Sequence, residues 1–333
     1  MFQVAPAKAE DVQRAMRLSR VRGLLLGLAL GDALASDKQF ERGTFYATVT
    51  TQLASFTTEG LIRMWVRGDH KGIGPALGVV WNAYRRWAMI QGIDLGRNTH
   101  ELDGWLCEVP ALAERRGNAP AIVTALKAAD GVQVVPAPAI SRGHHALTRL
   151  LPAAAVPWLR EEQVRQLASS AHGSATAIEA AVVGVVLARA ALTASSLREA
   201  IEQIDSSPLL DGVLDPEVPL DKLGRSHSAR SALRGGVAIA ARCPDGSPAA
   251  VHFALREARE AGVPAAVGPV AGALLGALYG VEALSTNLVG RLELGWVVDT
   301  LARDLVSQDL DHPGGFEFSE APDPDWMDRY PGW

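Results

Sequence analysis

The order of apolar and polar residues along the chain predicts a protein built almost entirely of helices. Strand-like alternation is scarce, and long stretches of Ala, Leu and Val supply most of the apolar side chains. Such stretches favour helices over sheets. After a charged leader at about 7–20, the pattern predicts helices at 21–34, 52–67, 73–91, 110–129, 143–154, 161–170, 175–193, 196–204, 228–241, 249–261, 267–284 and 288–306. We therefore expect an all-α fold.

Two segments rich in Pro, Gly and Asp, 130–143 and 206–224, interrupt the predicted helices. Such residues mark loops, but neither segment has the character of a linker between domains. The domain organisation that follows is a charged leader at 1–20, one helical domain at 21–311 and an irregular tail at 312–333. For this tail we expect loose packing or disorder. The alternative is that Trp326 and Trp333 cover a cleft or an interface.

Two predicted helices, within 177–192 and 267–284, are too apolar for the surface of a soluble protein. Glycines recur at four-residue intervals in the second of them and in the first predicted helix: Gly268, Gly272, Gly276 and Gly280, and Gly23, Gly27 and Gly31. Small-residue faces of this kind occur in membrane helices, but they also let two soluble helices pack closely. Asp32 directly follows the first series. We therefore predict a buried helix pair and no membrane span.

Composition and charge restrict the binding partners and the cellular compartment that we expect for this protein. Lys and Arg number 32 against 37 Asp and Glu, a formal charge of -5, and no long basic stretch is present, so we expect no nucleic acid partner. The first twenty residues mix charges throughout and lack the apolar stretch of a secretory signal, so we expect a cytoplasmic protein. Cys107 and Cys243 are far apart in no metal or redox spacing, and neither is proposed as a site.

Five segments together resemble the ADP-ribosylglycohydrolase family. Residues 23–35, GLLLGLALGDALA, are similar to the family's opening helix, Gly-x-Leu-x-Gly-x-Ala-x-Gly-Asp-Ala-Leu-Gly. The other four are TVTTQLASFTTEGLIR at 48–63, SRGHHALTRLLPAA at 141–154, AHGSATAIEAAVVG at 171–184 and EAGVPAAVGPVAGALLGALYGVEAL at 260–284. They resemble, in order, the Thr-Asp-Asp-Thr-Gln-Met helix, the Met-Arg-x-Ala-Pro turn and helix, the Thr-His-Gly-Asp/His-Pro segment and the closing Gly-Gly-Asp-x-Asp-Thr helix. The matching order runs from about residue 20 to 308.

The resemblance implies a compact helical bundle with an active site in a central cleft. It also implies a pair of Mg²⁺ ions on the floor of that cleft and removal of ADP-ribose from a modified side chain. Mg²⁺ takes hard oxygen ligands in near-octahedral geometry, and carboxylates at the starts of two helices can supply them.

This sequence departs from the family at the metal ligands. The family's metal-binding positions fall on Thr48, Val49 and Thr50 in the first motif and on Val263, Ala265 and Ala266 in the last. All four expected carboxylates are missing, and a neutral hydroxyl is too weak a ligand to replace a carboxylate against Mg²⁺ hydration. We therefore expect no metal and no cofactor, with Mg²⁺ only if the site is altered rather than lost.

Other acids near the motifs offer an alternative. The loop at 36–47 is shorter than in the family, and its only Glu, Glu41, is expected to be solvated rather than to gate a cleft. Asp32 is expected to be a buried, hydrogen-bonded acid at a helix end, and Glu59 a polar position on a half-buried helix. Glu257 and Glu260 are expected to be solvated and paired with Arg256 and Arg259.

The candidate ligand-binding residues follow from the resemblance. The turn that holds His144 and His145 corresponds to one that faces bound ribose, and Arg149 is a candidate for contact with a phosphate. The alternative is a turn histidine and an arginine that packs helices together. His172 is expected to bond a buried backbone group. The full set for a degenerate cleft is Thr48, Thr50, Thr51, Ser141, Gly143, His144 and Arg149.

Three functions remain open at this stage. The leading hypothesis is a catalytically inactive family member, a binding or regulatory module for an ADP-ribose-like nucleotide or a protein partner. The second is an active hydrolase with a changed or single-metal site. The third is a structural protein whose cleft is filled by side chains, in which case no pocket would lie near Thr48, His144 and Val263.

Overall fold

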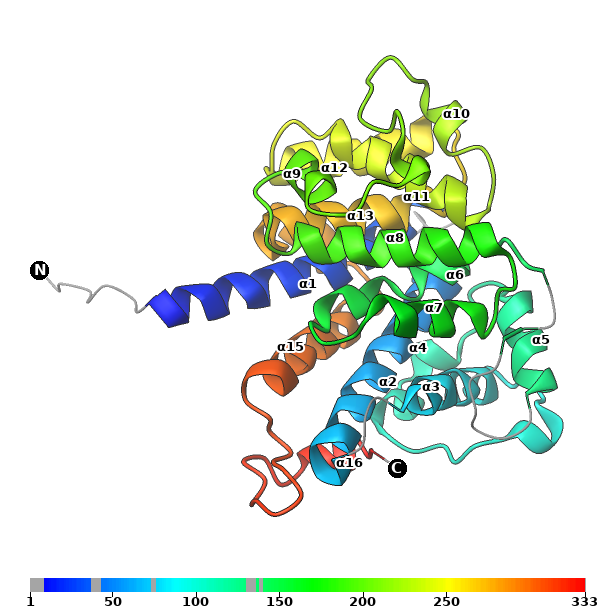
Figure 1. Cartoon of the computed structure of the whole chain (residues 1–333), viewed down its shortest axis with the longest axis vertical. Helices are drawn as coiled ribbons and strands as arrows, with labels where there is room; N and C mark the ends of the chain where they lie inside the picture. The colour runs from blue at the N-terminus through cyan, green and yellow to red at the C-terminus, as the bar shows by residue number, and fades with distance from the viewer. Residues whose placement is uncertain (1–8, 37–42, 73–75, 130–135, 138–139, 333) are drawn as a thin grey trace, which may run out of the picture.

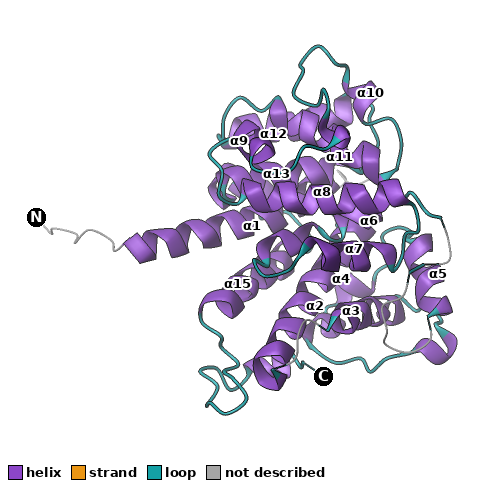
Figure 2. Cartoon of the chain, viewed as in Figure 1, coloured by secondary structure: helices purple, strands orange, loops and turns teal. Residues whose placement is uncertain are grey.

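The computed structural model describes residues 9–36, 43–72, 76–129, 136–137 and 140–332. Within these ranges the chain forms helices and loops and no strand, apart from two isolated β-bridges, Phe45 with Leu292 and Gly143 with Ser228 (Figure 2). The prediction of an all-α fold is confirmed. The α-helices are α1 (Ala9–Ala35), α2 (Val49–Lys71), α3 (Leu77–Ile90), α4 (Pro110–Ala113), α5 (Pro120–Ala128), α6 (His145–Thr148), α7 (Glu161–Ser169), α8 (Ala175–Ala191), α9 (Leu197–Glu202), α10 (Leu220–Leu223), α11 (Ala229–Ala241), α12 (Pro248–Glu260), α13 (Val267–Tyr279), α14 (Thr286–Val289), α15 (Gly295–Leu310) and α16 (Trp326–Arg329).

Helices α1 and α13 form the centre of the bundle (Figure 1). A Cβ atom added at Gly27 would overlap the backbone carbonyl of Gly272, and one added at Gly272 would overlap that of Gly27. The two backbones therefore touch, a closeness that only glycine permits. The prediction of a closely packed, buried pair is confirmed, and none of the described helices is long and apolar enough to cross a membrane.

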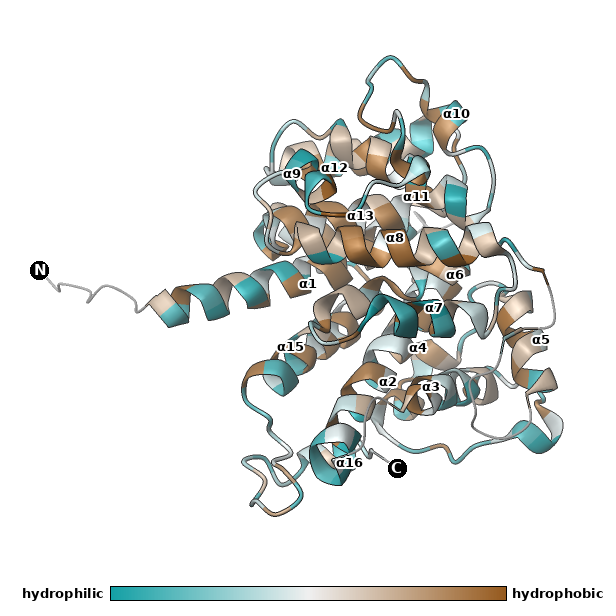
Figure 3. Cartoon of the chain, viewed as in Figure 1, coloured by the Kyte–Doolittle hydropathy of each residue, from teal (hydrophilic) through white to brown (hydrophobic). Residues whose placement is uncertain are grey.

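The other helices surround this pair in two groups. In Figure 1, α9 to α12 lie on one side of α8 and α13, and α2, α3 and α15 lie on the other. Colouring by hydropathy shows the apolar residues concentrated in α8 and α13, while the projecting end of α1 is polar (Figure 3). The placement of α13 explains why 267–284 is apolar on nearly every face, because a helix covered by its neighbours exposes little surface to solvent. Helix α8 is mostly buried but keeps a partly exposed side that includes Ile178, Glu179 and Val186.

The charged leader is not a separate element. Residues 9–20 continue without a break into the apolar part of α1, so that the helix has 27 residues. Ala, Arg, Gln and Met are good helix formers, and no Gly or Pro lies between Ala9 and Gly23 to stop the helix. Its first turns are exposed and project from the body of the protein (Figure 1), with Arg17 bonded to Asp309 at the end of α15.

Several predicted helices are shorter or divided. The helix expected at 110–129 is two helices, α4 and α5, separated by a segment with Gly117 at a φ of 147°. The helix expected at 143–154 is α6 followed by the 3-10 helix η4 (Leu151–Ala155). The helix expected at 288–306 is interrupted after α14, and α15 starts only at Gly295.

The tail packs against the body, so the expectation of loose packing or disorder is wrong for its described part. Trp326 is buried, and its Nε1 donates a hydrogen bond to Gln308 Oε1 at 2.8 Å. Tyr330 is also buried and donates to Asp304 at 2.6 Å. Its backbone is mostly turns, as expected, with α16 as its one α-helix among residues 312–332. Trp333 lies outside the described residues.

Candidate functional site

The two motifs that would carry metal ligands meet at the C-terminal end of α1. Gly31 packs against the backbone of Gly268 in the first turn of α13, and Asp32 bonds to Thr48 at the start of α2. The structure thus brings together the starts of α2 and α13, which are more than two hundred residues apart in the sequence. This is the geometry that the resemblance implies for the floor of a cleft.

Asp32 is the carboxylate at this point, and the fold uses both of its oxygens. Thr48 Oγ1 donates to Asp32 Oδ1 at 2.7 Å, and Thr51 Oγ1 donates to Oδ2 at 2.7 Å. The backbone N–H groups of Thr48 and Thr51 donate to Oδ2 at 3.0 and 3.3 Å. Burial raises the pKa of Asp32, and the hydrogen bonds from the two threonines oppose that rise. Asp32 is therefore a buried, hydrogen-bonded acid at a helix end, as expected.

The threonines of the first motif cap α2. Thr48 Oγ1 also accepts a hydrogen bond from the N–H of Thr50 at 3.0 Å, the usual role of an N-cap residue. Thr50 and Thr51 are buried. The hydroxyls of Thr48 and Thr51 thus belong to the contact between α1 and α2.

The remaining metal positions offer no ligand atoms in their side chains. Val49 is buried beside Gly117, whose added Cβ would lie 3.1 Å from Val49 Cγ1. Val263 is half-buried, Ala265 is exposed and Ala266 is buried. Among the described residues, no group of three or more His, Cys, Asp or Glu side chains has the geometry to hold a metal ion. A pair of Mg²⁺ ions does not fit these residues, because both oxygens of Asp32 are already bonded. The nearby carboxylate of Glu293 is likewise bonded, to the N–H of Ala47 at 3.3 Å and to Arg116 at 2.6 Å.

Glu59, Glu257 and Glu260, the possible replacement metal ligands, each form an ion pair with an arginine. Glu41 lies outside the described residues. Glu260 bonds to Arg256 at 2.6 Å, as expected. Glu257 instead faces Arg242 at 3.5 Å. These contacts direct both carboxylates toward arginines and not toward Asp32.

Glu59 is where the expectation from sequence is wrong. Residues 49–66 of its helix are all buried, so Glu59 is not a polar position on a half-buried helix, and it forms ion pairs with Arg63 of its own helix and with Arg86 of α3 at 2.7 Å. Arg63 continues the network to Asp103 Oδ1 at 2.9 Å. A buried carboxylate requires such partners. Glu59 is therefore part of a charge network between α2 and α3.

Three histidines lie close together behind the turn at 141–144. The rings of His144 and His145 are 4.0 Å apart, and a Cβ at Gly143 would lie 3.5 Å from His172 Nε2. Burial, with a smaller contribution from His227, lowers the pKa of His144 to about 4. Burial, followed by Arg149 and His144, lowers the pKa of His172 to about 3. All three rings are neutral at neutral pH, since burial also holds the pKa of His145 well below its ordinary value.

The Nδ1 atoms of His144, His145 and His172 are buried and have no hydrogen-bond partner among the described residues. The expected bond from His172 to the backbone is therefore not made by this atom. Neutral imidazoles with an unpaired nitrogen can accept or donate one further hydrogen bond. His227, whose backbone carbonyl accepts from the N–H of His144 at 3.0 Å, and Asn118, whose backbone bonds to the His145 ring, complete the surroundings. No spacing in the sequence signals these last two residues.

Arg149 packs helices together. It is fully buried, its Nη1 donates to the Tyr84 hydroxyl at 2.7 Å and its Nη2 donates to the carbonyl of Leu167. The structure therefore places this guanidinium in the core rather than on a surface that a phosphate could reach. Of the seven candidate ligand-binding residues, Thr48, Ser141, Gly143 and His144 are partly exposed, and Thr50, Thr51 and Arg149 are buried.

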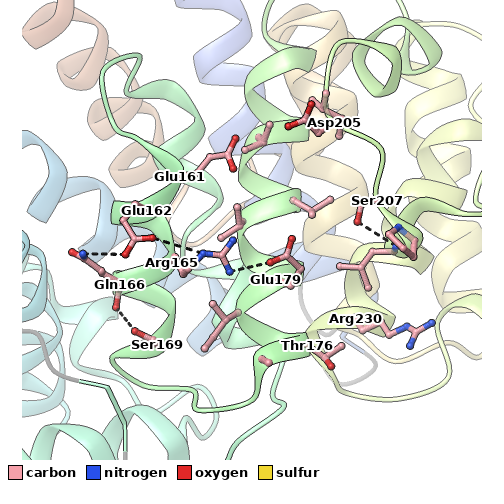
Figure 4. A pocket seen from close by; sticks show the side chains of 18 of the residues that line it. Glu161, Glu162, Arg165, Gln166, Ser169, Thr176, Glu179, Asp205, Ser207 and Arg230 are labelled. Carbon is pink, nitrogen blue, oxygen red and sulfur yellow. Dashed lines mark hydrogen bonds and ion pairs between the residues drawn. The ribbon is translucent and has the colours of Figure 1, made fainter.

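A pocket of about 970 Å³ lies away from these motifs, between α7, α8 and the loop at 204–209 (Figure 4). Arg165 of α7 crosses it to bond Glu179 of α8 at 2.9 Å. Five well-formed pockets are lined by described residues, and Thr48, His144 and Val263 lie in the walls of none of these five.

Comparison with known proteins identifies the family. The family model for ADP-ribosylglycohydrolase matches residues 13–313. A search of curated proteins finds no match. The fold is similar to a solved structure described as an "ADP-ribosylglycohydrolase-related protein complex", with a TM-score of 0.61, 24% identity, and coverage of 89% of this chain and 100% of that one. The convergence of α1, α2 and α13 and the match over nearly the whole chain show that this protein belongs to the ADP-ribosylglycohydrolase family.

Proposed function

We propose that this chain is a family member without metal-dependent ADP-ribosyl hydrolase activity, which acts as a binding or regulatory module. The observation that carries the proposal is that both oxygens of the Asp32 carboxylate are occupied by hydrogen bonds within the protein. This carboxylate accepts hydrogen bonds from four donor groups of Thr48 and Thr51, and the carboxylate of Glu293, beside the start of α2, is held by the N–H of Ala47 and by Arg116.

Hydrolysis in this family is expected to require a metal pair that orients the ribose and activates water. Each Mg²⁺ must exchange strongly held water for charged oxygen ligands, usually carboxylates. Valine and alanine side chains have no oxygen atom that could replace a water ligand of Mg²⁺, and the hydroxyl of Thr48 already donates to Asp32. Substitution at both motifs removes the whole ligand set rather than one member of it.

The ligand that we propose is an ADP-ribose-like nucleotide at the turn formed by 141–144. Ser141, Gly143 and His144 are partly exposed there, and His144 is neutral, so it can form a hydrogen bond without bringing charge. A protein partner is the second candidate, because the pocket beside α8 combines apolar residues such as Val186 with the exposed acids Glu161 and Glu162. The structural neighbour's description as a protein complex is consistent with that candidate.

The test of inactivity is release of ADP-ribose from arginine- and serine-modified peptides. We expect no release above the rate without protein, with Mg²⁺ or with a chelator. Release that requires Mg²⁺ and stops with the chelator would support an active hydrolase with an altered site and overturn the proposal.

The test of the ligand is calorimetry with ADP-ribose. We expect saturable binding that is equal with and without Mg²⁺ and weaker in His144→Ala. His70→Ala, at the far end of α2, is the matched control and should bind like the unchanged protein. No heat at millimolar ADP-ribose rejects the nucleotide and leaves a protein partner.

A further inference from the structure

A second pocket, of about 570 Å³, is lined by none of the residues at 48–51, 141–149 and 263–266. It is enclosed by the end of α1, by Phe45, by the last turns of α12 and by the segment that follows α14. Leu34, Phe45 and Leu288 form its apolar wall, and all three are largely buried. The pocket is large enough for a small organic molecule rather than a single ion.

The polar wall of this pocket is cationic. Arg256, Arg259 and Arg291 line it with Glu260 as the one carboxylate among the described wall residues. Arg256 is paired with Glu260, and Arg291 brings a further positive charge to this wall, although the whole chain carries -5. Like charges gathered in one concave site repel one another, and a bound anion relieves that repulsion.

Two of these guanidinium groups are held in place by the fold. Arg291 donates through Nε to the carbonyl of Gly43, and its guanidinium lies over the Phe45 ring at 4.2 Å. The Nη groups of Arg291 make no other hydrogen bond within the described part of the chain. Arg256 is oriented by its 2.6 Å bond to Glu260, one turn along α12. Fixed guanidinium forks lose less freedom on binding and match the oxygens of a phosphate.

We propose that this pocket binds a phosphate ester of a small organic molecule, with Arg256 and Arg291 on the phosphate and the organic part against Leu34 and Leu288. The site is separate from the turn at 141–144, so it goes beyond the proposed function. His252, half-buried in the same wall, supplies one more polar group.

Calorimetry with phenyl phosphate tests the proposal, since this probe joins a phosphate to an apolar ring. We expect saturable binding that is tighter than for inorganic phosphate and absent for phenol. Loss of one guanidinium contact should weaken binding by about tenfold, so Arg256→Gln and Arg291→Gln should each show that loss. The matched control is Arg303→Gln, which removes an arginine from a similar one-turn ion pair on α15, outside the pocket.

Equal affinity in Arg256→Gln and Arg303→Gln, or no binding of phenyl phosphate at millimolar concentration, would overturn the proposal. Binding of inorganic phosphate as tight as that of phenyl phosphate would overturn the role of the apolar wall. If Arg291→Gln unfolds, Arg256→Gln still decides the matter, because that side chain is 57% exposed and its loss leaves no hole. His144→Ala should leave phenyl phosphate binding unchanged, which separates this site from the proposed nucleotide site.

Discussion

Replacing Asp32 is the perturbation that tests its structural role most sharply. Asp32→Ala removes the acceptor of four hydrogen bonds and leaves the Thr48 and Thr51 donors facing a small cavity. Asp32→Asn keeps one oxygen as an acceptor but turns an amide N–H₂ toward those donors. We therefore expect both variants to be less stable than the unchanged protein, and Asp32→Ala the more so.

The size of the effect follows from the contacts. Hydrogen bonds to a charged group contribute about 1.5–3 kcal/mol each, but the cost of burying the carboxylate, which raises its pKa, offsets much of that sum. A net loss of about 3–4 kcal/mol is expected for Asp32→Ala. An unfolding entropy of about 2.1 cal/mol/K per residue, over 333 residues, is about 0.7 kcal/mol/K. The corresponding fall in Tm is about 4–6 °C.

Differential scanning calorimetry measures this fall, and Asp221→Ala supplies the control. Asp221 is exposed and faces Arg225 at 3.6 Å, so its removal should change Tm by less than about 1 °C. An Asp32→Ala protein as stable as Asp221→Ala would refute the reasoning. So would a stabilisation by Mg²⁺ that is present in the unchanged protein and lost in Asp32→Asn, because it would make Asp32 a metal ligand.

Two further predictions concern the helix pair and the histidines. Gly272→Ala should destabilise the protein by about 2–3 kcal/mol in thermal unfolding, despite the better helix propensity of Ala, because its Cβ would overlap the backbone of α1. Gly184→Ala, whose Cβ meets the side chains of Leu147 and Leu233 rather than backbone, should cost clearly less, and equal losses would contradict the close approach. The pKa of His144 and that of His172 are lower in the folded chain than in the unfolded one, so their neutral forms contribute full stability above pH 6.5, and this is lost as the pH falls toward 4 and 3. At pH 5 the loss of stability is about 2 kcal/mol for each ring. The Tm of the His144→Gln, His172→Gln double variant should therefore fall less between pH 7 and pH 5 than the Tm of the unchanged protein. Equal falls in Tm would contradict the assignment of these two pKa values.

Local patterns in the sequence predicted most of the helices but not all of their ends. The glycine spacing in α1 and α13 predicted a close pair because both series are local and regular. The division between α4 and α5 was missed although Gly117 and Pro120 mark it, because apolar residues on both sides continue the helical pattern. The continuation of the leader into α1 has no apolar signature at all, since its first turns contact little of the core.

The role of Asp32 was predictable from its position at the end of an apolar helix, but its partners were not. Thr48 and Thr51 belong to the start of the next helix, sixteen and nineteen residues further along the chain. Glu59 was misjudged because one of its partners, Arg86, lies on another helix. The tail was misjudged for the same reason, since Trp326 finds its hydrogen-bond acceptor in Gln308 of α15, a partner that its own segment does not contain.

Titration of Mg²⁺ into the protein by calorimetry is the most direct test of the central claim, that the family's metal site has been replaced by a hydrogen-bonded helix junction. The account predicts no saturable heat at millimolar Mg²⁺, in the unchanged protein and in Asp32→Asn alike. Saturable binding in the unchanged protein that disappears in Asp32→Asn would contradict it.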